Sequence, residues 1–123
     1  AFANLSAVCG AVAGEARPVH ILCAGTREQI SLDDVLPAGA MVEKLVAAGR
    51  AMVADDSGRV ALEAYRGALA SPGGLVAAMR SSRGGRNLDR IGLGADVEFC
   101  AASDTLAGVP RFDPAGNRIT LGG

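Results

Sequence analysis

The stretch that decides the fold runs from Pro18 to Asp34 and reads PVHILCAGTREQISLDD. A short apolar run, Val19–Ala24, leads into a Gly-Thr turn, and a helical pattern opens at Ser31. A buried strand whose carboxyl end leads into a glycine turn and then a helix is the usual ligand-binding corner of α/β proteins. We therefore expect an α/β fold, with helices layered around a small mixed β-sheet and a candidate site at this corner.

The residues after this strand suit a small anionic ligand. Gly25 lacks a Cβ, so its backbone can adopt a positive φ or approach a ligand closely. Thr26 adds a hydroxyl group and Arg27 a permanent positive charge, and two carboxylates follow at Asp33 and Asp34. A glycine, a hydroxyl, a cation and acids within so short a span are compatible with an anion accompanied by a metal ion.

Composition excludes several classes of protein. The 123 residues and the formal net charge of −1 indicate a single domain, residues 1–123, without a basic surface for nucleic acid. Half of the residues (50%) are apolar but only 3% are aromatic, so the core must be aliphatic. No apolar run reaches the roughly 18 to 20 residues that a membrane helix needs. We expect neither a nucleic-acid partner nor a membrane partner.

The three cysteines, Cys9, Cys23 and Cys100, lie in apolar surroundings without the spacing of a metal site. We interpret them as reduced, mostly buried thiols, which is typical of a cytoplasmic protein. A cysteine phosphatase needs an arginine six positions after its thiolate, and the residue at that distance from Cys23 is Gln29. The sequence therefore offers no cysteine-phosphatase loop.

Helical periodicity and capping residues predict the other elements. The expected helices follow Asn4, Ser31, Asp55 and Ser71. Residues 96–100 alternate and predict a strand, and residues 109–121 predict a closing hairpin around an Asp-Pro-Ala-Gly turn. The chain starts at Ala1 rather than at Met and enters a helical pattern at once, so we expect a piece of a longer protein.

Asp34 has two interpretations. Ser31 and Asp34 resemble a capping box, in which a carboxylate in the first turn satisfies free amides and opposes the helix dipole. The same position faces the glycine turn. Capping and ligand binding are therefore both compatible with the local sequence.

Residues 80–88 form a second segment with two interpretations. It holds three arginines, two serines and two glycines, and it precedes a shorter helical stretch that ends near Gly92. A solvated loop is one interpretation. Anion binding is the other, because guanidinium groups and the free amides of a Gly/Ser turn suit phosphate or sulfonate oxygens.

Several segments follow one another in the order of a known family. They are Asn4–Val8, Ile21–Thr26, Ser31–Leu36 with Ala38–Gly39, Ser82 with Gly85–Leu88, Gly92–Leu93, Val97–Ala101 and Val109–Pro110. In this order the chain resembles the carboxy-terminal half of the 2-phosphosulfolactate phosphatase (ComB) family. The resemblance implies an α/β phosphatase half-domain of coenzyme M biosynthesis that depends on Mg²⁺ and hydrolyses 2-phosphosulfolactate to sulfolactate and phosphate. The chain departs from the family pattern at Asp33, where Glu is common.

The resemblance also implies roles for individual residues. Asp34 is expected to bind Mg²⁺ and, together with Cys23 and Arg86, to be catalytic. The substrate, a small anionic phosphate ester, is expected to contact Gly25, Thr26, Ser82 and Arg86. Cys23 has two interpretations, simple packing or an accessible thiol whose pKa is lowered beside the anion site.

The family is longer than this chain, and its amino-terminal half has no counterpart here. We expect this fragment alone to be inactive and to pack against that missing half, and an oligomer is compatible with the sequence. Two other functions stay open: a non-catalytic anion-binding α/β module, and a structural half-domain whose arginines are merely solvated. Metal-dependent release of phosphate by the intact protein would separate the enzyme from both.

Overall fold

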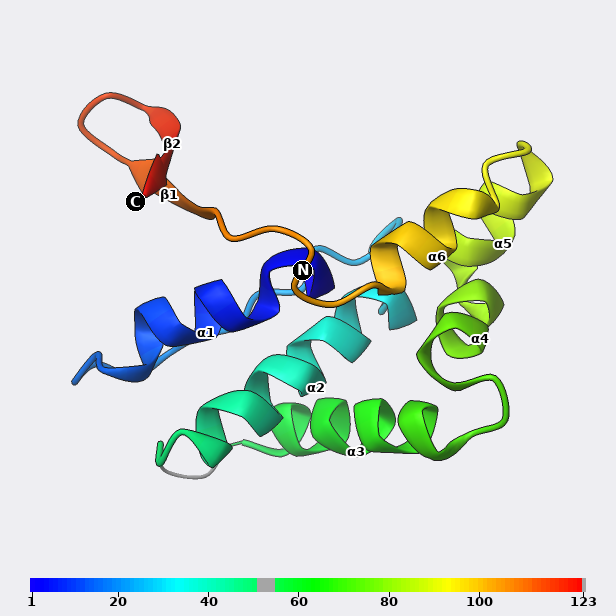
Figure 1. Cartoon of the computed structure of the whole chain (residues 1–123), viewed down its shortest axis with the longest axis horizontal. Coiled ribbons are helices and arrows are strands. Elements are labelled where there is room, and N and C mark those ends of the chain that lie inside the picture. Colours follow the sequence, from blue (N-terminus) through cyan, green and yellow to red (C-terminus); the bar gives the residue numbers. More distant parts are fainter. Residues whose placement is uncertain (51–54, 123) are drawn as a thin grey trace.

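A computed structural model describes residues 1–50 and 55–122 (Figure 1). The elements in chain order are η1 (Phe2–Asn4), α1 (Leu5–Ala13), α2 (Leu32–Ala47), α3 (Asp56–Ala70), α4 (Gly74–Ser81), α5 (Arg83–Arg90), α6 (Ala95–Ala101), β1 (Val109–Asp113) and β2 (Arg118–Gly122). Within this part of the chain, six α-helices accompany a small two-stranded antiparallel sheet, which confirms an α/β fragment.

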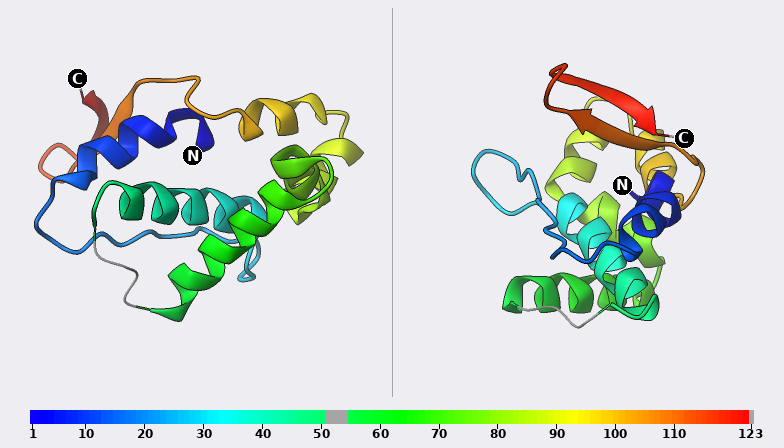
Figure 2. Two further views of the ribbon diagram at one scale, coloured as in Figure 1. Left: turned by 60° about the horizontal axis from the view of Figure 1, so that its bottom comes forward. Right: turned by 90° about the vertical axis from the view of Figure 1, so that its left-hand side faces the viewer.

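The core forms where α2 packs against both α1 and α3 (Figure 2). Leu36, Ala40 and Leu45 of α2 are buried, and they belong to one cluster with buried side chains from α1, α3, α4 and α6. The aliphatic core that the composition predicts is confirmed, with Phe2 as an aromatic addition that lies beside Tyr65 at a ring distance of 6.1 Å.

The predicted starts of three helices are confirmed. Asn4, Ser31 and Asp55 occupy the N-cap positions of α1, α2 and α3. The Asp55 carboxylate accepts a hydrogen bond from the Gly58 amide at 2.9 Å, the usual way in which an acidic cap satisfies a free donor. The helix expected after Ser71 begins later, at Gly74.

Two predicted strands are wrong. Residues 96–100 lie in α6, because Val97 and Ala101 stand four positions apart and are buried on one helical face. Residues 19–24 are extended, but no strand in the described part of the chain lies beside them to supply hydrogen bonds. The closing hairpin is confirmed, since β1 and β2 pair from Val109 with Gly122 to Asp113 with Arg118.

The loop expected at residues 80–88 is also wrong for most of its length. Residues up to Ser81 complete α4, and Arg83–Arg90 form α5. Ser82 separates the two helices and caps the second, since its buried hydroxyl accepts a hydrogen bond from the Gly85 amide at 2.9 Å. In the part of the chain that the structure describes, no helix is both long and apolar enough to cross a membrane.

The close approach of α2 to α3 depends on Gly39. A Cβ at this position would lie 2.0 Å from the Ala61 carbonyl oxygen and 2.8 Å from the Tyr65 Cβ. We expect Gly39→Ala to lower the free energy of unfolding by about 1–3 kcal/mol, because the two helices would have to separate. Urea unfolding followed by circular dichroism measures the change.

The matched control is Gly67→Ala in α3, where a Cβ would meet no atom within 4 Å. This substitution should raise the free energy of unfolding by about 0.5–1 kcal/mol through helix propensity alone. Equal effects of the two substitutions would contradict the packing argument.

Candidate functional site

Residues 25–31 form a tight loop in front of α2. The backbones of Thr26 and Gln29 exchange hydrogen bonds of 2.9 and 3.1 Å. Gly25 has a φ of 70°, and a Cβ on it would lie 2.7 Å from the Gln29 carbonyl oxygen. The positive φ expected of the glycine turn is therefore confirmed, and the residue must be glycine.

Asp34 anchors this loop to the first turn of α2. Its Oδ2 accepts a hydrogen bond from the Gly25 amide at 2.7 Å, so the carboxylate faces the glycine turn as expected. The Thr26 amide donates to the Gln29 carbonyl. Both amides that the sequence assigns to phosphate binding thus already have partners inside the chain.

Asp33 joins the start of α2 to the start of α5. Its Oδ1 accepts a hydrogen bond from the Ser31 hydroxyl at 2.6 Å. Asp33 also lies against the start of α5. A Cβ on Gly84 would lie only 2.8 Å from Asp33 Oδ2, so the side chain packs directly against this glycine. Partial burial raises the pKa of Asp33, but hydrogen bonds from Ser31, from its own amide, from Ser82 and from Gly84 outweigh this and lower it. Asp33 is therefore firmly ionised.

An open cavity of about 360 Å³ lies beside this junction. Asp33 and Ser82 line it, together with Asn87, Leu88, Val97 and Cys100. Sequence reasoning named Ser82 but gave Asp33 no separate role. The signal was present, because adjacent acids in the first turn of a helix point in different directions, and only one of them can face the glycine turn.

The loop and α5 do meet, but through Arg83 rather than Arg86. The Arg83 guanidinium donates hydrogen bonds to the Thr26 carbonyl oxygen, at 3.5 Å, and to the Gln29 side chain. The Arg86 guanidinium is exposed and donates to the Ser81 carbonyl. Arg83 was missed because a loop was expected where Ser82 caps a helix. With Ser82 as the cap, Arg83 is the first residue of α5 and is the arginine that contacts the loop.

Cys23 is an exposed thiol whose Sγ donates to the Asp34 carbonyl at 3.6 Å. Partial desolvation and the negative charge of Asp34 raise its pKa, so the lowered pKa considered for an anion-site thiol is not found. Cys100 is exposed as well, and only Cys9 of the three is buried. The expectation of mostly buried cysteines is therefore wrong.

A magnesium site is not complete within residues 1–50 and 55–122, where no group of three His, Cys, Asp or Glu side chains could hold a metal ion. Proteins usually hold Mg²⁺ by one or two carboxylates together with water and substrate phosphate. Asp34 fits as one such ligand, because one of its oxygens binds Gly25 and the other accepts no hydrogen bond from the described residues.

Comparison with known proteins identifies the family. The family model described as 2-phosphosulpholactate phosphatase matches residues 1–114. The chain belongs to this family. The resemblance seen in the sequence is thereby confirmed.

Two relatives, from Deinococcus radiodurans and Symbiobacterium thermophilum, are each named probable 2-phosphosulfolactate phosphatase. They are 40% identical over 104 residues and 39% identical over 94 residues. These alignments cover 85% and 76% of this chain but only 41% and 39% of the relatives. The family member described here thus spans about two-fifths of the length of the curated relatives it matches.

The lowered pKa of Asp33 predicts a pH dependence of stability. A carboxylate whose pKa is lower in the folded state stabilises the fold above its ordinary pKa of about 3.9, and this contribution is lost as the pH falls through the folded-state value. We expect Asp33→Asn to lower the free energy of unfolding at pH 7 by on the order of 1 kcal/mol. The difference from the unsubstituted chain should shrink below about pH 4.

Urea unfolding at several pH values measures this difference. Asp96→Asn is the control, because Asp96 is an exposed aspartate in the first turn of α6. A pH-independent difference for Asp33→Asn, or an equal effect of the control, would contradict the role given to the hydrogen bonds at Asp33.

Proposed function

We propose that this chain is part of a phosphatase that hydrolyses 2-phosphosulfolactate to sulfolactate and phosphate and depends on Mg²⁺. The observation that carries the proposal is the family match over residues 1–114. The printed names of the relatives support the substrate. Because the chain spans about two-fifths of those relatives, we assign the remaining groups of the site to the rest of a family-length protein.

The chemistry requires positive groups and fixed donors around the transferring phosphoryl oxygens, where negative charge increases in the transition state. When bound, Mg²⁺ supplies a Lewis acid, and Asp34 is the ligand that we propose from this chain. Gly25 and Thr26 are proposed to contact the phosphate. The amide of Gly25 becomes available to a phosphate oxygen once Asp34 releases it.

We assign the second anionic group of the substrate to Ser82 and Arg86. Ser82 lines the cavity beside Asp33, and Arg86 follows it by one helical turn in α5. A guanidinium group suits a sulfonate or a carboxylate because it presents paired N–H donors. This assignment requires Arg86 to exchange the Ser81 carbonyl for the substrate.

Cys23 has a different part in the proposal. Its raised pKa keeps it a thiol, which is a poor nucleophile toward phosphorus. We therefore place it as a positioning residue that holds the Asp34 backbone through its contact with the Asp34 carbonyl.

A non-catalytic anion-binding module is the second candidate. It is favoured by the incomplete metal site, since no group of three His, Cys, Asp or Glu side chains in residues 1–50 and 55–122 could hold a metal ion. Such a module would bind phosphate without releasing it from an ester, so turnover separates the two candidates.

We expect Asp34→Asn and Arg86→Ala to lower kcat/KM for 2-phosphosulfolactate by about 10²–10³-fold in a family-length protein that contains this chain. Each substitution removes a charged group that we place on the metal or on the substrate. Colorimetric detection of released phosphate measures the rate. Arg90→Ala is the control, since Arg90 is an exposed arginine in the last turn of the same helix. Unchanged turnover in both test variants would remove these two residues from the site.

The metal requirement has its own test. We expect EDTA to abolish phosphate release by the family-length protein and added Mg²⁺ to restore it, because hard oxygen ligands such as Asp34 select this ion. Full activity in EDTA after dialysis would contradict the proposed magnesium dependence without affecting the family assignment.

A further inference from the structure

Residues 19–24 have the apolar sequence of a buried strand, but no strand in the described chain pairs with them. The segment reads VHILCA and contains no Asp, Glu, Lys or Arg. Leu22 is 93% exposed. No backbone-to-backbone hydrogen bond to residues 18–24 is found within the described chain. Figure 2 draws this stretch as a coil, without a strand arrow, between the end of α1 and the start of α2.

One face of the segment is already covered. Val19 packs against the core and Ile21 is half-buried, whereas His20, Leu22 and Ala24 are exposed. From Val19 to Leu22 this alternation has the period of two that a β-strand imposes on its side chains, and it ends at Cys23, which is exposed. The core therefore covers Val19 and part of Ile21, whereas Leu22 and Ala24 on the other side of the segment are exposed in the described structure.

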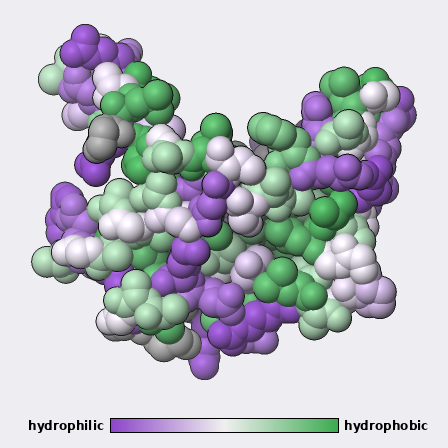
Figure 3. All heavy atoms as spheres, in the orientation of Figure 1, coloured by the Kyte–Doolittle hydropathy of each residue, from purple (hydrophilic) through white to green (hydrophobic). Residues whose placement is uncertain are grey.

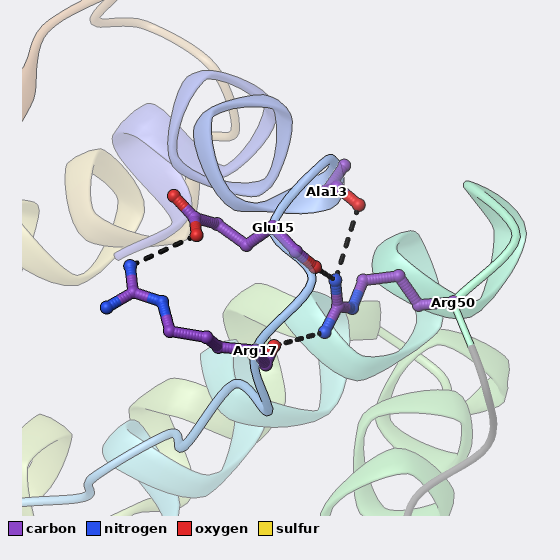
Figure 4. A network of polar contacts seen from close by, with 4 residues as sticks. All are labelled: Ala13, Glu15, Arg17 and Arg50. Carbon is purple, nitrogen blue, oxygen red and sulfur yellow. Dashed lines mark hydrogen bonds and ion pairs between the residues drawn. The ribbon is translucent and has the colours of Figure 1, made fainter.

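The residues between α1 and this segment are held by Arg50. Its guanidinium donates hydrogen bonds to the Ala13 carbonyl at 3.4 Å, to the Arg17 carbonyl at 2.8 Å, and to the Glu15 carbonyl (Figure 4). Arg17 also forms an ion pair of 3.0 Å with the Glu15 carboxylate. The chain that leaves α1 is thereby tied to the end of α2.

The end of the segment that precedes α2 is fixed by Asp34. Its carboxylate binds the Gly25 amide, and its carbonyl accepts from the Cys23 thiol. A segment held extended between two anchors loses less conformational entropy on pairing than a free chain does. Residues 19–24 are thus prepared for a partner strand.

The apolar surface continues beyond the segment. An open groove of about 410 Å³ lies between α1, the start of the segment and the hairpin, and its lining includes Val8, Val12, Val19, Val109 and Pro110. On the hairpin, Phe112, Ile119 and Leu121 are all more than half exposed. Figure 3 shows hydrophobic residues among the polar ones on the surface of the hairpin.

We propose that residues 19–24 pair with a β-strand from the part of a family-length protein that lies outside this chain, and that the sheet so formed covers Leu22. The length of the curated relatives supports this partner strand, because they extend well beyond the two-fifths that this chain matches. The sequence of the segment supports the same partner, because a run that is apolar at every position except His20 is typical of a strand inside a sheet. The proposal depends on family membership and not on the phosphatase activity, so either can fail alone.

Amide hydrogen exchange in a family-length protein that contains this chain tests the pairing. We expect amides in residues 19–24 to exchange about 100-fold or more slowly than those of Thr105 and Ala107, which lie in an exposed connection outside any helix or strand. Exchange as fast as at Thr105 and Ala107 would overturn the proposal. Protection that disappears on dilution to the monomer would also overturn it, since the partner would then be a second copy.

Proline substitutions in the same family-length protein provide a second test. Neighbouring amides of a strand point to opposite edges, so at least one of Ile21→Pro and Leu22→Pro removes a ladder hydrogen bond. We expect that variant to lose the slow exchange and to melt at a lower temperature, whereas Leu22→Thr, which keeps the amide and is β-branched, retains the protection. Unchanged exchange and melting in both proline variants would overturn the proposal.

Discussion

Two adjacent carboxylates at the start of α2 hold this corner of the molecule together. Asp34 binds the Gly25 amide and so fixes the loop in front of the helix. Asp33 binds the Ser31 hydroxyl and lies against Gly84 at the start of α5. Because the two side chains point in different directions from consecutive positions, one helical turn connects the loop, α2 and α5. The position of every candidate residue near the cavity depends on this arrangement.

The same arrangement explains why the loop in front of α2 suits an anion although the negative charges of Asp33 and Asp34 already lie beside it. Helix N-termini and free amides attract negative groups. In the described chain these donors are satisfied by Asp33 and Asp34, and Arg83 adds a cation across the loop. A substrate anion would therefore compete with internal carboxylates, and a metal ion bound at Asp34 would change that competition.

The features that could be read from the sequence are those decided by neighbours in the chain. Asp55 caps α3 through an amide three residues away, and the Asp-Pro-Ala-Gly turn closes its own hairpin. The strand predicted at residues 96–100 was wrong because an alternation of only five residues does not distinguish a strand from one face of a helix. The contact of Arg83 with Gln29 could not be predicted, because the two residues lie far apart in the sequence. Long-range contacts of this kind leave no local pattern.

The unpaired segment 19–24 and the incomplete metal site are neighbours in the chain. Ala24, the last residue of this segment, directly precedes Gly25, whose amide is the first candidate donor to phosphate. Pairing of residues 19–24 would fix the position and direction of that amide. The partner strand would bring neighbouring residues of the same polypeptide to this edge, where ligands collect at the carboxyl ends of strands. One docking event would thus complete both the sheet and the set of ligands around Asp34.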